Sequence, residues 1–231
     1  MAHGKTYNAV KEKVSEENIY SVEDAIAFLK ENPTAKFDET FELAIRTGLD
    51  ASKSDQAIRS TVALPNGTGK DVRVIVFATG DAAEAARGAG AIEVGFEDLL
   101  EKVKGGWMDF DVVVATPDAM KEVRKVARIL GPRGLMPNPK TGTVTDDTAS
   151  AVTQLKAGRV EFRMDRNANI QVPFGKRSFT VEALAENFRA TYDAIVSAKP
   201  DSSKGIFIKR CTIATTMGPG LHVDVKETAD A

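Results

Sequence analysis

The sequence predicts an α/β protein of two domains, and three observations support this prediction. Residues 37–46 and 160–173 alternate apolar and polar side chains, which is typical of antiparallel strands with one buried face. Residues 72–78 and 110–115 are almost entirely apolar, which is typical of parallel strands buried on both faces. Because the alternating strands lie towards the chain ends and the apolar ones between them, one domain is predicted to be inserted into the other.

Neither end of the chain has enough strands for an independent core. We therefore predict that residues 1–66 and 159–231 fold together as one split α+β domain, sandwich-like and built on an antiparallel sheet. Residues 67–158 alternate strand and helix, which predicts an inserted, doubly wound parallel α/β domain of Rossmann-like type. Two chain crossings between the domains would make a hinge, and the glycines expected there are Gly67, Gly69 and Gly158.

In the split domain, apolar spacing predicts helices over residues 5–18, 22–31 and 179–197, the second capped by Ser21. The strands predicted for this domain are residues 37–46, 59–64, 160–164, 170–173 and 204–217. Of these, 160–164 and 170–173 are expected to pair as a hairpin. In the first strand, the residues expected on the buried side are Phe37, Glu39, Phe41, Leu43 and Ile45.

In the inserted domain, the predicted strands are residues 72–78, 91–94 and 110–115, and the predicted helices are 81–87, 96–104, 117–130 and 148–157. Between the last two helices, Gly131 to Gly142 contains three prolines and three glycines, which exclude a helix or a central strand. We predict a long loop of defined path. It is either a rigid connector or a phosphate contact through Arg133 and Lys140, and it contains no residue typical of catalysis.

The composition is that of an ordinary globular protein, and 231 residues suffice for two modest domains. No apolar run approaches 18 residues, so we expect no membrane span, and the first residues lack the apolar core of a secretory signal. Cys211 is the only cysteine, which excludes an internal disulfide and indicates a cytoplasmic protein.

The charge distribution does not predict a broadly basic surface. Lys and Arg number 8 against 11 Asp and Glu in residues 1–66, 12 against 13 in residues 67–158, and 11 against 9 in residues 159–231. No part of the chain produces the strong positive field that attracts nucleic acid over long distances. RNA, if bound, is expected at a local site whose cations are gathered by folding.

Nucleotide and metal sites have little support in the sequence. In Asn66–Lys70, the position that a phosphate-binding loop requires to be glycine is Pro65, and no Ser or Thr follows the lysine. The Gly88–Gly90 segment lacks the third glycine of a dinucleotide fingerprint and precedes a strand. His3 and His222, both expected in chain tails, belong to no ligand cluster. We expect no cofactor, no metal and no catalytic set.

Two stretches have both a structural and a functional interpretation. Thr212 to Gly220, with small hydroxyls and glycines, is either a plain strand end or a surface that a ligand backbone approaches closely. Four cations at helical spacing are either a solvated helix face or a secondary RNA contact beside Arg133 and Lys140: Lys121, Arg124, Lys125 and Arg128.

Six segments occur in order along the chain: residues 36–40 (Lys-Phe-Asp-Glu-Thr), 106–111 (Gly-Trp-Met-Asp-Phe-Asp), 115–118 (Ala-Thr-Pro-Asp), 131–142, 156–163 (Lys-Ala-Gly-Arg-Val-Glu-Phe-Arg) and 215–219 (Thr-Thr-Met-Gly-Pro). Together they resemble the bacterial family of ribosomal protein L-one, the first-numbered protein of the large ribosomal subunit. Because the segments span nearly the whole chain, the resemblance is specific. It implies a split first domain with a second domain inserted into it.

The resemblance also implies an RNA-binding surface. In this family the Thr-Met-Gly triplet contacts RNA, and the segment at 36–40 lies beside it. A lysine at 36 suits phosphates, and Phe37 suits packing on a sugar or an unstacked base. The residues expected to bind RNA are Lys36, Phe37, Thr40, Arg163, Asp165, Lys176, Thr216, Met217 and Gly218.

We therefore predict a non-enzymatic protein, a monomer when free, that binds a structured site on large-subunit ribosomal RNA by shape, 2′-hydroxyl and backbone contacts. The resemblance implies a place in the mobile stalk beside the transfer RNA exit site, help in releasing deacylated tRNA, and repression of the protein's own operon mRNA. The rival classes are an enzyme that binds a nucleotide in the doubly wound insert and a protein-interaction scaffold. The missing phosphate-binding glycines argue against the enzyme.

Overall fold

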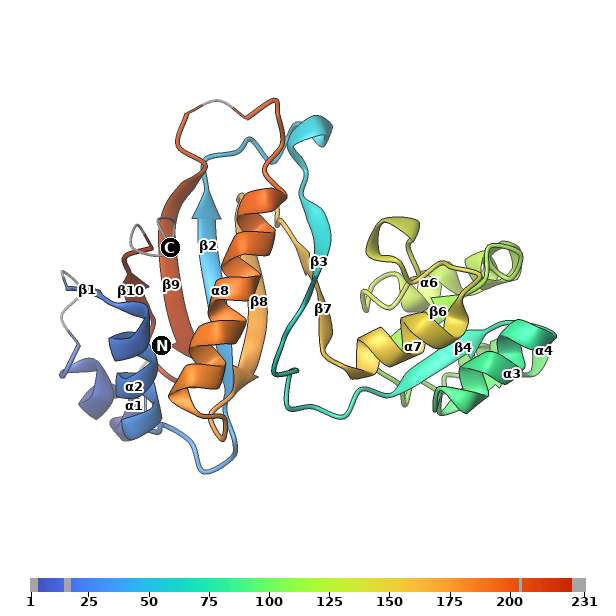
Figure 1. The fold of residues 1–231 in the computed structure, drawn as a ribbon, viewed down its shortest axis with the longest axis horizontal. Coiled ribbons are helices and arrows are strands. Elements are labelled where there is room, and N and C mark those ends of the chain that lie inside the picture. The colour runs from blue at the N-terminus through green and yellow to red at the C-terminus, as the bar shows by residue number, and fades with distance from the viewer. Residues whose placement is uncertain (1–3, 15–17, 204, 226–231) are drawn as a thin grey trace. The chain divides into compact units, whose positions relative to one another are not determined.

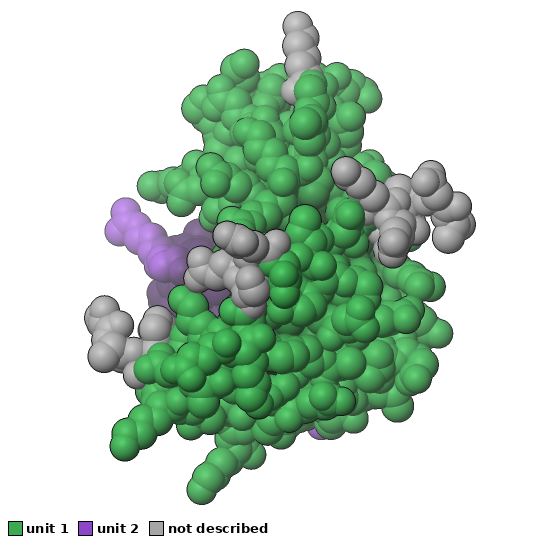
Figure 2. Space-filling view, turned by 90° about the vertical axis from the view of Figure 1, so that its left-hand side faces the viewer, with its two compact units in different colours: residues 1–69, 160–231 green, residues 70–159 purple. Residues whose placement is uncertain are grey.

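The computed structural model describes residues 4–14, 18–203 and 205–225. The chain divides into two compact units, residues 1–69 with 160–231 (unit 1) and residues 70–159 (unit 2), which Figure 2 shows in different colours. Unit 2 has a parallel sheet, and unit 1 has a mainly antiparallel sheet made by both ends of the chain. The predicted α/β fold class is therefore confirmed.

A five-stranded sheet, in the order β1-β10-β9-β2-β8, forms the centre of unit 1 (Figure 1). Its strands are β1 (Ile19–Tyr20), β2 (Thr40–Thr47), β8 (Asn169–Lys176), β9 (Ile208–Thr215) and β10 (Leu221–Val223). All neighbouring strands are antiparallel except β1 and β10, which are parallel. Because β2 lies between β8 and β9, the two halves of the split unit share one sheet.

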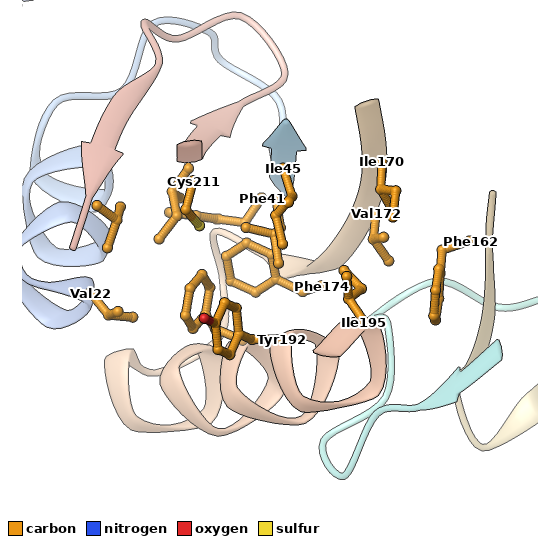
Figure 3. Packing of buried hydrophobic residues seen from close by; sticks show 14 of the residues in the cluster. Val22, Phe41, Ile45, Phe162, Ile170, Val172, Phe174, Tyr192, Ile195 and Cys211 are labelled. Carbon is orange, nitrogen blue, oxygen red and sulfur yellow. The ribbon is translucent and has the colours of Figure 1, made fainter. Parts of the chain in front are cut away.

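The core of unit 1 lies on one face of this sheet, under α2 (Val22–Glu31) and α8 (Val181–Ser197). Each helix begins at a side-chain cap: Ser21 accepts a hydrogen bond from Asp24 N at 3.1 Å, and Thr180 accepts one from Ala183 N at 3.2 Å. Figure 3 shows side chains of β2, β8 and β9 meeting those of α8. A further helix, α1 (Lys5–Lys11), precedes this arrangement.

The other face of the sheet carries polar side chains and short ones. Alternate residues of β2 are buried, so Glu42, Ala44 and Arg46 project away from the core, and their directly opposite partners on β8 and β9 share that direction. We call this the open sheet face: Glu42, Ala44, Arg46, Asn169, Gln171, Pro173, Arg210, Thr212 and Ala214. Each of these residues is exposed or half-buried.

A second, two-stranded sheet pairs β3 (Arg59–Ala63) with β7 (Arg159–Arg163). The predicted pairing of residues 160–164 with 170–173 is therefore wrong, apart from one bridge between Met164 and Ile170. The turn between them does form, but β7 continues to β3 while β8 joins β2. Alternation identified both strands and their turn, yet it contains no information about which strand each one pairs with.

Other differences concern short elements of unit 1. β1 and β10, with two and three residues, are too short for a periodic pattern and were not predicted. His222 lies in β10 opposite Thr212, not in a tail, whereas His3 lies outside the described residues. The helix predicted over residues 5–18 ends at Lys11, and residues 15–17 lie outside the described ranges. The strand predicted over residues 204–217 begins at Ile208, and residue 204 is not described.

Unit 2 has the central strand β4 (Val74–Phe77) between β5 (Glu93–Gly95) and β6 (Val112–Ala115), all parallel. Ile75 and Phe77 pack with α4 (Glu97–Lys104), while Val74 and Val76 pack with α3 (Asp81–Gly88) and α7 (Thr148–Lys156). The apolar run predicted a strand that is buried on both faces. β4 is such a strand, because its successive side chains enter two different cores.

The helix predicted over residues 117–130 is interrupted. It consists of α5 (Met120–Val123), a 3₁₀ turn η2 (Arg124–Val126) and α6 (Ala127–Leu130). Val123 and Val126 are both fully buried in the same core, and a 3₁₀ turn aligns side chains three positions apart. The interrupted helix therefore keeps this pair in one core.

The loop from Gly131 to Gly142 follows a defined path, as predicted. Pro137 is buried, and Leu135 and Met136 pack against the core of unit 2. The short turn η3 (Pro139–Thr141) is capped by Asn138, and Gly142 ends it at a φ of 68°. This left-handed backbone favours glycine, and a Cβ there would also lie 2.8 Å from the Arg159 guanidinium, which would have to move aside.

An ion-pair network lies where unit 2 begins. The Asp111 carboxylate accepts hydrogen bonds from Lys70 Nζ at 2.7 Å and from Arg73 Nε at 3.0 Å, and Arg73 also pairs with Asp109. Desolvation raises the pKa of Asp111, but the hydrogen bonds from Arg73 and Lys70 outweigh it and lower the pKa from 3.8 to about 2. The folded state therefore gains stability from this carboxylate above pH 3.8, and loses it as the pH falls towards 2.

We expect Asp111→Asn to lower the free energy of unfolding of unit 2 at pH 7 by about 1 kcal/mol, after allowance for solvent screening. The variant should also flatten the fall in stability between pH 4 and pH 2. Trp107, the only tryptophan, packs in unit 2, so its fluorescence during urea denaturation reports on this unit. Asp71→Asn, at an exposed neighbouring position, is the control. Equal pH profiles for wild type and Asp111→Asn would contradict the assignment.

Candidate nucleic-acid interface

The ends of three strands meet at one edge of the unit 1 sheet. Thr216 follows β9 directly, and its N–H donates to Thr40 O at 3.1 Å while Thr40 N–H donates to Thr216 Oγ1 at 3.0 Å. Lys176, the last residue of β8, donates from Nζ to Thr40 Oγ1 at 2.8 Å. The fold thereby gathers seven of the nine predicted RNA-binding residues into what we call the strand-end surface: Lys36, Phe37, Thr40, Lys176, Thr216, Met217 and Gly218.

A buried carboxylate lies beneath this surface. The Glu39 side chain has no solvent exposure, and its Oε1 accepts hydrogen bonds from Thr34 Oγ1 at 2.8 Å and from Met217 N at 3.2 Å. Arg177 Nη1 lies 3.6 Å from Glu39 Oε2. One charged group thus joins the segment before β2, the residue after β8 and the turn after β9.

Two large apolar side chains are exposed beside this carboxylate. Phe37, two residues before Glu39, is 52% exposed, and Met217, whose N–H bonds to Glu39, is 56% exposed. The prediction that Phe37 lies on the buried side of a strand is wrong, because β2 begins only at Thr40. Lys36 is exposed too, and it has no hydrogen-bond or ion-pair partner in the described part of the chain.

Packing explains why a glycine ends the triplet. A Cβ at Gly218 would lie 2.2 Å from Thr215 Oγ1, which is a severe clash with a buried side chain. Gly218 N–H also donates to Thr215 O at 3.1 Å, which closes a tight turn. Any larger residue would push the chain outwards and displace Met217 from its place above Glu39.

Arg163 and Asp165 lie apart from the strand-end surface. Asp165 N–H donates to Asn169 O at 2.8 Å, and Asn169 pairs with Arg46 at the far end of β2. Since Thr40 and Arg46 are six strand residues apart, this turn lies about 20 Å from Thr40. Hydrogen bonds to its carboxylate, first from Asn169 N–H and then from Asn167 N–H, lower the pKa of Asp165. The carboxylate therefore organises the turn.

The cations predicted as a secondary contact lie in unit 2. All four on α5, η2 and α6 are exposed, and Lys125 pairs with Glu122 at 2.6 Å. Arg133 and Lys140, in the loop, are exposed as well. Their part in RNA binding stays a prediction, as does the solvated-face alternative.

The predicted hinge glycines all have left-handed backbone. Their φ angles are 68° at Gly67, 68° at Gly69 and 107° at Gly158, a region that favours glycine. The chain passes between the units at residues 69–70 and 159–160. On the unit 1 side, Gly67 O accepts a hydrogen bond from the buried Asn187 Nδ2 at 3.0 Å. Hinge motion at these glycines stays a prediction.

Catalytic and metal chemistry find no support in the described residues. They contain no group of three or more His, Cys, Asp and Glu that could hold a metal. Gly88–Gly90 lies at the end of α3, and the beginning of α3 carries Asp81 and Glu84, which would repel a phosphate. Burial raises the pKa of Cys211 to about 12, so its thiol is not an available nucleophile.

The role of Glu39 and Arg177 in organising the surface was not predicted from the sequence. One signal was present: alternation placed Glu39 on the buried side of a strand. A buried carboxylate without partners is very costly, so this position favours a nearby cation. Which of the neighbouring cations it was could be seen only from the structure.

Fold and surface define a class: a two-unit α/β protein in which strand ends present a surface of exposed polar and aromatic side chains. The sequence profile of the Ribosomal protein L1p/L10e family matches residues 29–219, and the chain belongs to this family. Among similar proteins are the large ribosomal subunit proteins uL1 of Cutibacterium acnes (54% identical over 231 residues, all of both chains), Lactobacillus delbrueckii subsp. bulgaricus (56% over 222 residues, 96% of each chain) and Thermosipho africanus (55% over 223 residues, 96% of each chain).

Membership of this family confirms the resemblance inferred from the six segments and makes the chain a ribosomal protein, not an enzyme. It also places the protein in the cytoplasm. None of the helices in the described ranges has the length and apolar character that crossing a bilayer requires.

We expect Glu39→Gln to lower the free energy of unfolding of unit 1 by about 1–3 kcal/mol, because Arg177 loses its charge partner while remaining largely buried. All three tyrosines lie in unit 1, so tyrosine fluorescence during urea denaturation reports on this unit. The control is Glu42→Gln, three residues further along the chain in β2, where the side chain is exposed. Equal stabilities of the two variants would show that the buried carboxylate does not hold the surface together.

Proposed function

We propose that this protein is a structural constituent of the large ribosomal subunit and binds large-subunit ribosomal RNA through the strand-end surface of unit 1. The observation that carries this proposal is the position of exposed Phe37 and Met217 beside the cations Lys36 and Lys176. Exposed aromatic and thioether groups pack on bases and riboses, and lysines contact phosphates. The printed names of the relatives support the same assignment.

The net charge of −2 gives the chain no broad positive field. We therefore expect few phosphate contacts and an affinity that depends mainly on short-range fit. The hydroxyls and backbone groups of Thr40 and Thr216 are fixed by their mutual hydrogen bonds. A rigid surface of this kind recognises the shape, 2′-hydroxyls and backbone of a folded RNA without reading base pairs in a helix.

Three finer roles complete the proposal: two follow from the family resemblance, and the contact by unit 2 follows from the helical spacing of its cations. The protein occupies the mobile stalk beside the exit site, and its two units move about the glycines at the crossings to help release deacylated tRNA. The cations of unit 2 make the secondary RNA contact. The same strand-end surface binds the protein's own operon mRNA, because that message mimics the ribosomal site, and so represses its translation.

A filter-binding titration with a large-subunit rRNA fragment at several salt concentrations tests the proposal. Saturable binding with a shallow dependence on salt is the expected result. Equilibrium dialysis with ATP and NAD tests the rival enzyme, and an RNA-free pulldown tests the scaffold. Tight binding of ATP or NAD, or a stable protein partner, together with no affinity for rRNA would overturn the proposal.

We expect Phe37→Ala and Met217→Ala each to weaken rRNA binding by about 5- to 150-fold, which corresponds to the loss of about 1–3 kcal/mol of base or sugar packing. Stability should not fall, because both side chains are exposed. Ile206→Ala is the matched control, since Ile206 is also a large apolar residue of unit 1 and is 75% exposed. Unchanged affinity in both variants would remove the strand-end surface from the interface.

Deletion of residues 70–159, with the gap closed by a short linker, should retain most of the rRNA affinity. The reason is that both parts of unit 1 contribute strands to one sheet and the strand-end surface lies within that unit. Circular dichroism establishes that the shortened chain is folded, and filter binding measures its affinity. Complete loss of binding by a folded product would make unit 2 the main RNA-binding unit.

A further inference from the structure

Two arginines lie directly opposite each other on the open sheet face. Arg46 of β2 and Arg210 of β9 are partners in the antiparallel ladder, so their side chains project to the same side. Both are exposed, whereas the adjacent partners Ile45 and Cys211 are buried on the other side. Like charges in directly opposite positions destabilise a sheet, so this pair costs free energy in the isolated protein.

Ion pairs do not offset this repulsion in the part of the chain that the structure describes. In the described residues neither arginine forms a salt bridge, and the nearest acid of β2 on this face, Glu42, is four strand residues or about 13 Å away. The Asp165 carboxylate, in the nearby turn, accepts hydrogen bonds from backbone N–H groups. Arg210 is oriented by His222, because its Nε donates to His222 Nδ1 at 3.0 Å.

Both arginines line a hollow in the surface of the sheet. The hollow has a volume of about 140 Å³, and short side chains at Ala44 and Thr212 leave this space open. The amides of Asn169 and Gln171, on β8, line it with hydrogen-bonding groups. The hollow is smaller than the roughly 300 Å³ at which pockets for small molecules begin, so it suits one small group of a larger ligand.

We propose that Arg46 and Arg210 together bind a phosphodiester group of the RNA. Guanidinium groups present planar forks of donors that match phosphate oxygens, and an anion between them removes the like-charge repulsion. This inference rests on the proposed function, and it extends the contact from the strand-end surface along β2. The site lies towards the Asp165 turn, so the RNA would follow a strip about 20 Å long on one face of the sheet.

Filter binding of the rRNA fragment to Arg46→Gln, Arg210→Gln and the double variant tests this site. Each single change should weaken binding about 5- to 20-fold, and the double variant should lower the slope of log affinity against log salt by about 0.7–0.9, the value for one phosphate. The matched control is Arg189→Gln, which removes the same charge from the exposed face of α8. Thermal melts without RNA should show the Gln variants to be as stable as wild type or more stable.

The possible outcomes separate this inference from the proposed function. If wild type binds the fragment while the double variant keeps both its affinity and its salt slope, the phosphate site is wrong and the strand-end proposal stands. If wild type does not bind the fragment, the proposed function fails and this site fails with it. If a Gln variant unfolds, Arg46→Lys and Arg210→Lys replace it, because lysine retains the charge. The folded Lys variants should bind the rRNA fragment more weakly than Arg189→Gln does. Affinities equal to that of Arg189→Gln would contradict a guanidinium site.

Discussion

The pairing of β2 with β8 on one side and β9 on the other is the constraint on which the rest of unit 1 depends. The long ladders that join the two ends of the chain both run along β2, and the intervening residues fold as a separate unit. The same ladder brings Thr40 against Thr216 and Lys176, and it sets Arg46 opposite Arg210. Register thus determines both the core and the surface, since a shift by one residue would exchange the two faces.

Burying Glu39 is costly, and the structure shows what the burial achieves. Desolvating a carboxylate costs several kcal/mol, which its attraction to a partner only partly offsets. An apolar residue of similar size would fill this volume at lower cost, but it could not accept hydrogen bonds from Thr34 and Met217 at once. The buried charge therefore helps to define the surface. It fixes the turn that carries Met217, and packing alone would not hold this exposed side chain in place.

Much of the fold could be predicted from local patterns. Capping at Ser21, the apolar run of β4 and the period-two alternation of β2 each depend on neighbours in sequence, and each is present in the structure. Pairing partners could not be predicted this way, so β7 was assigned to a hairpin, although its partner is β3. Phe37 continues the alternation of β2 but lies beyond the end of its ladder, so only the structure reveals its exposure.

The site shows the same division between local and long-range information. The six family segments identified the triplet and the segment before β2, but net charge gave no sign of a basic surface. The reason is physical: Arg46 and Arg210 are 164 positions apart in sequence, and only the strand register of β2 against β9 makes them neighbours. A net charge of −2 is therefore compatible with a local concentration of cations, because electrostatic interaction with a phosphate falls off within about 10 Å at ordinary salt. What the RNA meets at contact distance is the arrangement that folding creates, and the total charge of the chain has little influence at that range.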